Sequence, residues 1–213
     1  MIDIFPVINV ASFEEVKEKI RAVESHVPWV HIDVSDGSFT PVVSWHTPAD
    51  LEGLKTALRI EIHFMVREPE RTIAEWFLPP VSRIIFHHEA TSAHAAVIRA
   101  CREHAREVGL AIIPETPWKV TRPFFDSVDL IQTLAVSPGP SGQSFDERTL
   151  SKVRAIRGEH AHIPIEVDGG IRVGTARACR EAGATILVAS SSLFDTDKTF
   201  REALALLRHD VSS

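Results

Sequence analysis

The sequence has few cysteines, no excess of positive charge and no long apolar run. Its 213 residues include two cysteines, Cys101 and Cys179, far apart in the chain, which argues against a disulfide framework and favours a reducing compartment. The formal net charge of -6 offers no electrostatic footprint for nucleic acid. No apolar stretch approaches the length of a membrane span, and Asp3 stands where a secretory signal would carry positive charge. We therefore expect a cytoplasmic protein that binds neither nucleic acid nor membrane.

Short apolar runs alternate with amphipathic runs along the whole chain, with no linker between them. The first pair is a strand over 2–10 and a helix to about residue 24 that begins after Ser12, with Glu15 at the capping-box spacing. Further strands are predicted at 27–34, 59–66, 81–87, 110–113, 128–136, 163–168 and 185–189. Further helices are predicted at 48–57, 68–77, 92–108, 117–125, 145–157, 173–182 and 195–208. Eight such units predict an α/β TIM barrel, a single domain over residues 1–213, with an open doubly wound sheet as the alternative.

Metal-ligating and proton-transferring side chains recur at the C-terminal ends of these strands, where TIM barrels hold their active sites. His31 and Asp33 are two residues apart on the second strand, so their side chains leave the same face. His63 lies near the end of the third strand, and Asp168 ends the seventh. Two imidazoles and two carboxylates suit one divalent transition metal, and this donor set does not choose among Zn²⁺, Fe²⁺, Mn²⁺ and Co²⁺.

Four other polar residues near strand ends have two interpretations each. Glu61 and Glu166 stand two residues before predicted ligands, so each could support a ligand histidine from one layer below or be turned outward by local twist. His87 and His88 end the fourth strand and could face the site, although an ordinary structural histidine is the favoured interpretation of both.

Small residues follow the last two strands in a pattern typical of phosphate binding. Gly169 and Gly170 follow the seventh strand, and the serines at 190–192 follow the eighth. TIM barrels often bind phosphate through bare backbone N–H groups in these two loops. The loop at 139–143 is a third candidate, as part of the phosphate site, as a cover over it, or as a plain connection.

The chain resembles the ribulose-phosphate 3-epimerase family along nearly its whole length. The matching blocks are HIDVSDGSFTP (31–41), HFMV (63–66), FHHEA (86–90), PETP (114–117), SPGPSGQSF (137–145), EVDGGI (166–171) and VASSSLF (188–194). The resemblance implies a TIM barrel that binds one divalent metal through His31, Asp33, His63 and Asp168, with the two aspartates also acting as acid and base. It further implies that Gly142, Gly170, Ser190 and Ser191 hold phosphate; the predicted substrate-binding set also includes Gly169, from its place after the seventh strand, and Met65.

Several positions around the expected substrate depart from the family's usual pattern. The family usually has Ser at the position of Val10. It has methionines at those of Ser35 and Leu134, which with Met65 would form an apolar cap over the reacting carbons. Pro140 falls in a loop that is usually richer in glycine. The predicted ligands are intact while the surrounding walls are altered, which supports the reaction class more firmly than the exact sugar.

The predicted activity is the interconversion of D-ribulose 5-phosphate and D-xylulose 5-phosphate. A proton would be removed from C3 and returned on the other face through an enediolate, with the metal as Lewis acid at the C2 oxygen. Asp33 and Asp168 can act from opposite faces because their strands are three steps apart in an eight-strand ring. Two alternatives stay open: a 3-epimerase of another ketose phosphate, such as D-allulose 6-phosphate, and a sugar-phosphate-binding barrel with little turnover. A homo-oligomer is expected from the family.

Overall fold

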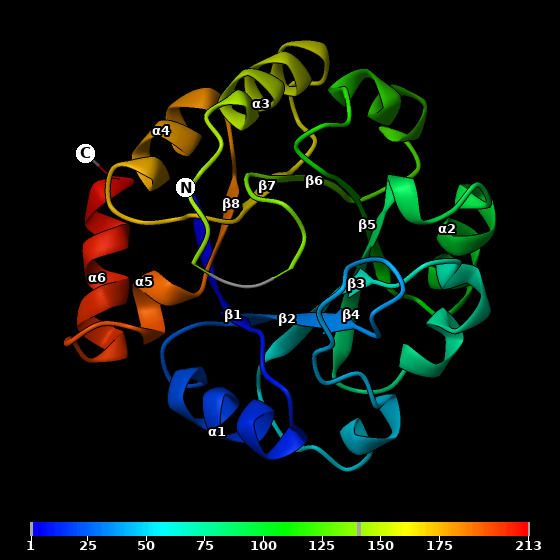
Figure 1. Cartoon of the computed structure of the whole chain (residues 1–213), viewed down its shortest axis with the longest axis horizontal. Coiled ribbons are helices and arrows are strands. Elements are labelled where there is room, and N and C mark those ends of the chain that lie inside the picture. Colours follow the sequence, from blue (N-terminus) through cyan, green and yellow to red (C-terminus); the bar gives the residue numbers. More distant parts are fainter. Residues whose placement is uncertain (1, 140–141, 213) are drawn as a thin grey trace.

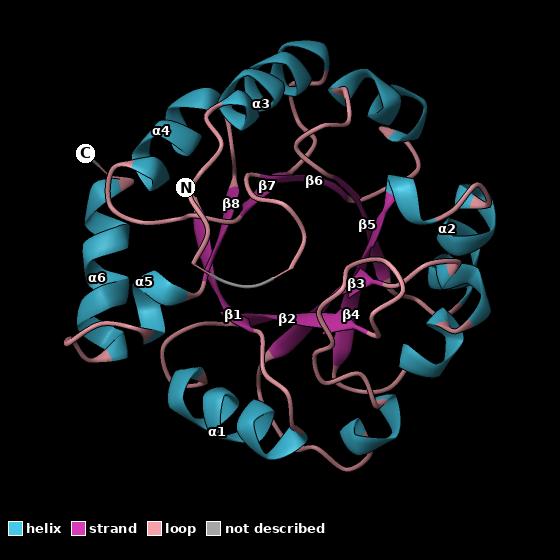
Figure 2. Cartoon of the chain, viewed as in Figure 1, coloured by secondary structure: helices cyan, strands magenta, loops and turns pink. Residues whose placement is uncertain are grey.

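Eight parallel strands close into a barrel in the part of the chain that the computed structural model describes, residues 2–139 and 142–212. Helices form an outer ring around these strands (Figure 1, Figure 2). Each strand pairs with the next along the chain, and β1 (Asp3–Ile8) closes the ring by pairing with β8 (Ile186–Ala189). The strands between them are β2 (Trp29–Ser35), β3 (Arg59–Met65), β4 (Val81–His87), β5 (Glu107–Ile112), β6 (Leu130–Leu134) and β7 (Ile165–Asp168). The predicted single-domain TIM barrel is confirmed, and the open doubly wound sheet is wrong.

Both faces of the strands are buried, which explains why they read as nearly continuous apolar runs. Along β2, Val30, Ile32 and Val34 belong to the large apolar core between the sheet and the helices. A smaller apolar cluster made by alternate strand residues fills the barrel interior: Phe5, Val7, Trp29, Ile85, Ala111, Leu130, Leu134, Ile186 and Val188. Polar residues that share this inward alternation therefore also lie inside the barrel.

The first helix begins where the sequence predicts. α1 (Phe13–Val23) has Ser12 as its N-cap: the Ser12 hydroxyl accepts from the Glu15 N–H, and the Glu15 carboxylate accepts from the Ser12 N–H. This reciprocal pairing satisfies two backbone donors that the first turn leaves free. The other α-helices are α2 (His94–Glu103), α3 (Arg148–Glu159), α4 (Thr175–Ala182), α5 (Ser191–Phe194) and α6 (Phe200–Asp210).

Several predicted helix bounds are wrong. The helix predicted at 92–108 ends at Glu103, because Ala105 adopts a left-handed φ of 53° and the Arg106 N–H closes the last turn on the Cys101 carbonyl. β5 consequently begins at Glu107, three residues earlier than predicted. The helices predicted at 48–57, 68–77 and 117–125 are short 3₁₀ helices instead: η1 (Pro48–Leu51), η2 (Pro69–Arg71), η3 (Ile73–Trp76) and η5 (Trp118–Phe124). A further one, η4 (His88–Ala90), follows β4.

Loops that follow β2 and β6 meet over the C-terminal end of the barrel. The Thr40 hydroxyl, in the loop after β2, donates to the Pro138 carbonyl, in the loop after β6, at 3.1 Å. These loops partly cover the end at which a barrel carries its chemistry. Among the described residues, no helix has the length and the apolar character needed to cross a bilayer.

Candidate active site

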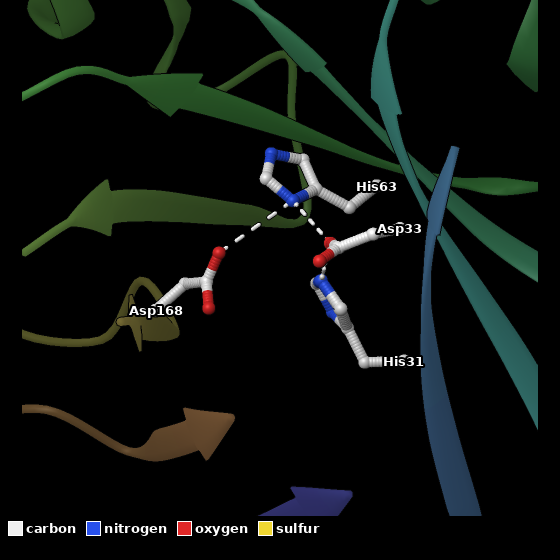
Figure 3. A group of neighbouring side chains, drawn as sticks. All are labelled: His31, Asp33, His63 and Asp168. Carbon is white, nitrogen blue, oxygen red and sulfur yellow. Dashed lines mark hydrogen bonds and ion pairs between the residues drawn. The ribbon is translucent and has the colours of Figure 1, made fainter. Parts of the chain in front are cut away.

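The four predicted ligands converge at the C-terminal end of the barrel (Figure 3). β2 supplies His31 and Asp33, β3 supplies His63 and β7 supplies Asp168. Asp33 and His63 are register partners on neighbouring strands, so their side chains start from the same level of the barrel. Each of the four residues offers one nitrogen or oxygen atom, and these four atoms all lie within 4.8 Å of one another. The structure thus brings together all four residues that the sequence singled out.

The imidazoles and carboxylates alternate around one point. His63 Nδ1 lies 3.0 Å from Asp33 Oδ1 and 3.6 Å from Asp168 Oδ2 (Figure 3). His31 Nε2 lies 3.3 Å from the same Asp33 oxygen. The four side chains are nearly buried, with exposed fractions between 0% for His31 and 15% for Asp168. Water screening is therefore weak here, and the charges of the two carboxylates act strongly on the imidazoles.

A second polar layer supports this cluster from inside the barrel. His31 Nδ1 lies 2.7 Å from Glu61 Oε1, and Arg83 Nη1 donates to the other Glu61 oxygen at 2.5 Å. The Gln132 amide donates to Glu166 Oε1 at 2.9 Å. The predicted support of a ligand histidine by Glu61 is confirmed in geometry, and the outward-turned alternative is wrong for both glutamates, which are fully buried.

The barrel interior accommodates the carboxyl groups of Glu61 and Glu166 in different ways. Burial alone would raise the pKa of Glu61, but the hydrogen-bonded His31 and the Arg83 guanidinium lower it to about 2. Burial and the Glu61 charge raise the pKa of Glu166 well above its usual value. One of the two glutamates is thus held ionised beside its cationic partners, while its neighbour favours the neutral form.

The chemistry of the cluster fits a divalent cation. His31 Nε2 is buried and has no hydrogen-bond partner among the described residues, although it faces the carboxylate of Asp33. Burial alone would lower the pKa of His31, but the carboxylates of Asp33 and Glu61 raise it well above its usual value, so the position favours positive charge. Two nitrogen and two oxygen ligands are a common donor set for a divalent transition metal. The four residues could hold such an ion, and the donor set does not choose its identity.

The two aspartates flank one cavity and yet differ in pKa. Burial alone would raise the pKa of Asp33, but the imidazoles of His31 and His63 hold it well below its usual range. Burial and the Asp33 charge raise the pKa of Asp168 to about 6. Asp33 also accepts a hydrogen bond of 2.9 Å from the Asn9 amide, at the end of β1.

Asn9 and His87 contact the cluster; the sequence left open that His87 could face the site and did not point to Asn9. His87 is fully buried at the end of β4, and its Nε2 lies 2.8 Å from His63 Nε2. His87 thus faces the site, the interpretation that the sequence favoured less. Strand alternation carried the missing signal: Asn9 follows Val7 by two residues and His87 follows Ile85 by two, and both apolar residues lie inside the barrel.

The residues predicted to bind phosphate line one cavity with Asp33, His63 and Asp168. They are Gly142, Gly169, Gly170, Ser190 and Ser191. Gly169 and Gly170 have φ values of 101° and 65°, which favour glycine. A Cβ on Gly170 would lie 2.8 Å from the Cβ of Phe145, so the backbone at Gly170 runs close to Phe145. Ser190 occupies the position before the short α5 without a capping hydrogen bond from its side chain, whereas the Ser192 hydroxyl donates to the Ile171 carbonyl and Ser192 is not among the lining residues. Pro140 and Ser141 lie outside the described residues.

The apolar side of this cavity includes residues beyond the one methionine that the sequence retains. Met65 and Leu134 line it together with Val7, Val136, Ile171 and Val188. The Ser35 hydroxyl instead donates to the Val42 carbonyl at 2.7 Å, and the Val10 carbonyl accepts from the Trp45 N–H. Neither Ser35 nor Val10 is among the residues that line the cavity in the described part of the chain.

A model of the ribulose-phosphate 3-epimerase family matches residues 3–194. The chain belongs to this family. It is 34% identical over 200 residues to the ribulose-phosphate 3-epimerase of Schizosaccharomyces pombe, with 92% of this chain and 87% of that protein covered. It is 32% identical over 202 residues to that of Bacillus subtilis, with 91% and 93% covered. Members of the ribulose-phosphate 3-epimerase family are carbohydrate epimerases, so the predicted isomerase class is confirmed.

A solved structure supports the fold of this family member independently. The crystal structure of 3-hexulose-6-phosphate synthase superposes with a TM-score of 0.71 over 99% of this chain and 100% of its own, at 16% sequence identity. At so low an identity the similarity concerns the barrel alone, since one fold serves many activities.

Proposed function

We propose that this protein is a metal-dependent 3-epimerase that interconverts D-ribulose 5-phosphate and D-xylulose 5-phosphate. The observation that carries the proposal is the placement of Asp33 and Asp168: they reach one cavity from strands three steps apart in the ring, with His63 within 3.6 Å of both. Epimerisation at C3 needs a proton to leave one face of the sugar and another to arrive on the opposite face. Two carboxyl groups on different strands provide that arrangement.

His31, Asp33, His63 and Asp168 would hold one divalent cation. When bound, the cation would supply Lewis-acid stabilisation of the negative charge that develops beside C3 as the proton leaves. The chain's own contacts hold the ligands in place beforehand: Glu61 accepts from the His31 ring, and the Asn9 amide donates to Asp33. The side chains are therefore positioned before substrate arrives, which lowers the cost of ordering them during the reaction.

Asp33 and Asp168 would share the proton transfers. In one direction Asp33 takes the C3 proton as a carboxylate and Asp168 returns a proton to the opposite face. In the reverse direction the two exchange roles. Burial of both carboxyl groups keeps bulk water from the reacting carbon, which limits loss of the enediolate to side reactions.

The loops after β7 and β8 would bind the phosphate of the substrate. Gly169, Gly170, Ser190 and Ser191 border the cavity with Gly142, and the two glycines have no side chains of their own that would stand between their backbone N–H groups and a phosphate. Binding a remote phosphate helps to hold the reacting carbons in position, because that binding energy can be used at the transition state.

A longer ketose phosphate is a second candidate substrate. The apolar residues that line the cavity with the aspartates are Val7, Met65, Leu134, Val136, Ile171 and Val188, and Ser35 is not among the lining residues. Ser35 and Leu134 stand where the family usually has methionines, so the apolar cover that these two positions provide over the reacting carbons is reduced. D-Allulose 6-phosphate, with one additional carbon, is the substrate that this observation favours after ribulose 5-phosphate.

A panel of ketose phosphates tests the proposal. The protein is loaded with Zn²⁺, Mn²⁺, Fe²⁺ or Co²⁺ in turn and incubated with ribulose 5-phosphate, allulose 6-phosphate and unphosphorylated ribulose, and products are followed by NMR. We expect xylulose 5-phosphate as the fastest product. Preferential turnover of the hexulose phosphate would establish the second candidate, and binding without turnover of any would establish a sugar-phosphate-binding barrel. A homo-oligomeric state and a cytoplasmic location stay predictions from the sequence.

A further inference from the structure

A line of polar contacts leads from His63, in the candidate metal cluster, through His87 to Glu89 in the short helix η4. His87 Nε2 lies 2.8 Å from His63 Nε2, and His87 Nδ1 lies 3.4 Å from Glu89 Oε2. The other Glu89 oxygen accepts a hydrogen bond of 3.0 Å from the Ile113 N–H, at the end of β5. His87 is fully buried, and the Phe39 ring packs on its imidazole with ring centres 4.5 Å apart. The His87 ring is therefore shielded from solvent and held between His63 and the Glu89 carboxylate, whose side chain is 20% exposed.

Hydrogen-bond chemistry permits only one arrangement of protons along this order that leaves His63 free to bind a cation. A neutral imidazole donates from one ring nitrogen and accepts at the other. A carboxylate can only accept a hydrogen bond. Glu89 therefore stabilises the tautomer of His87 that carries its proton on Nδ1, the nitrogen that faces Glu89. His87 Nε2 is then an acceptor, and the facing His63 Nε2 must be the donor. His63 Nδ1 then points its lone pair at the site between Asp33 and Asp168, where a bound cation would take it up; without a cation, a proton on this nitrogen would be donated to the Asp33 oxygen 3.0 Å away.

With a cation bound between His63 and the two aspartates, the opposite arrangement leaves two acceptors facing each other at the Glu89 end. If His87 Nε2 carried the proton, the lone pair of His87 Nδ1 would face the Glu89 carboxylate. His87 Nδ1 and Glu89 Oε2 are buried, form no regular hydrogen bond in the described part of the chain, and lie 3.4 Å from each other, so with the proton on His87 Nε2 neither atom would be satisfied. An unsatisfied buried polar group destabilises the arrangement that contains it.

We infer that Glu89 and His87 are positioning residues that fix the tautomer of His63, so that its Nδ1 is presented to the cation. Metal-binding histidines commonly donate their second ring nitrogen directly to a carboxylate or carbonyl. Here an additional imidazole stands between the histidine and the carboxylate. The inference rests on the proposed metal site, and its tests are measured without substrate.

The tautomers can be observed directly. Long-range ¹H–¹⁵N spectra of the zinc-loaded protein, labelled at histidine, distinguish a protonated ring nitrogen from an unprotonated one. We expect the proton of His63 on Nε2 and that of His87 on Nδ1. In Glu89→Gln, the amide can satisfy only one of its two neighbours, so the His87 proton should redistribute toward Nε2. A His87 proton on Nε2 in the wild-type protein would overturn the inference.

Zinc affinity, measured by competition with a chelator, gives the second test. His87→Leu should weaken zinc binding by about ten- to a hundredfold, the usual effect of removing a partner of a metal ligand. His87→Gln should restore most of the affinity, because its amide oxygen can accept from His63 Nε2. His88→Leu is the matched control: the His88 ring packs against His94, and we expect wild-type affinity. Melting temperatures of the metal-free variants show whether each one folds.

The outcomes separate this inference from the proposed function. Wild-type zinc affinity in folded His87→Leu, together with normal epimerisation, would refute the positioning role of His87 and Glu89 and leave the proposed function intact. Equal losses of zinc affinity in His87→Gln and His87→Leu would indicate that His87 only packs against His63, and would also refute the positioning role. The expected tautomers and zinc affinities in a protein that turns over no ketose phosphate would refute the proposed function alone. A wild-type protein that binds no zinc would refute both.

Discussion

Replacing Asp168 by Asn tests whether the two aspartates act on opposite faces of the sugar. Asn keeps the size of the side chain and one oxygen that can bind a cation, but it cannot transfer a proton as a carboxyl group does. The contacts that position Asp33 do not involve Asp168: Asn9 donates to it at 2.9 Å, and His63 Nδ1 lies 3.0 Å away. The longer 3.6 Å contact between His63 and Asp168 is the one that changes. The variant therefore removes one proton-transfer group and leaves the other in place.

We expect epimerisation by Asp168→Asn to fall by about a hundredfold or more, the effect of losing a general acid or base. A hundredfold loss corresponds to a rise of about 2.7 kcal/mol in the activation barrier. Exchange of the C3 proton should behave differently from epimerisation. In deuterated water, Asp33 should still exchange the C3 proton of one epimer without forming the other. Asp33→Asn should exchange the proton of the opposite epimer.

The assay follows C3–H exchange and product formation together by ¹H NMR, from each epimer separately. Metal content is measured in both variants beforehand, because both aspartates are also proposed ligands. Asp36→Asn is the matched control, since the Asp36 carboxylate lies in the exposed loop after β2 and accepts from the Ser38 N–H; we expect the wild-type rate. If Asp168→Asn keeps its metal and epimerises as fast as the wild type, the two-carboxylate mechanism is wrong.

Three further changes test other parts of the proposed site and fold. His63→Ala should lose most of the bound metal by elemental analysis, whereas His94→Ala, whose ring contacts the His88 carbonyl, should lose none; equal content in the two would argue against the cluster as the metal site. Ser191→Asp should raise the KM for ribulose 5-phosphate through like-charge repulsion, and an unchanged KM would place the phosphate elsewhere. Ser12→Ala should lower the free energy of unfolding by about 1 kcal/mol in urea titrations, because it removes the N-cap of α1; no change would mean that the cap contributes little.

Local sequence signals predicted most of the strands and the cluster of ligands. β4 was predicted with the bounds Val81–His87 that the structure has, because its apolar run is framed by prolines before and a polar segment after. His31, Asp33, His63 and Asp168 were predicted together because side chains alternate along strands and the C-terminal ends of parallel strands share one edge. These two rules need no knowledge of which strands are neighbours.

Local signals failed where the chain had a choice of how to end a helix. Ala105 is a good helix former, and nothing in its type signals a turn. It nevertheless takes a left-handed φ and ends α2, and the strand β5 that follows is held between β4 and β6. The free energy that decides this boundary comes from burying β5 in the barrel, which outweighs the small propensity of a few residues to extend the helix.

By itself, the sequence determined the alternation of strands and helices, the capped start of α1 and the common face of His31 and Asp33, since each depends on residues close in the chain. Only the tertiary structure decided that β8 pairs with β1, and hence that Asp168 lies within reach of His63. It also decided that His87 meets His63. Such contacts depend on strand register and on how side chains fill the closed barrel, which are properties of the whole ring of strands and not of any one segment.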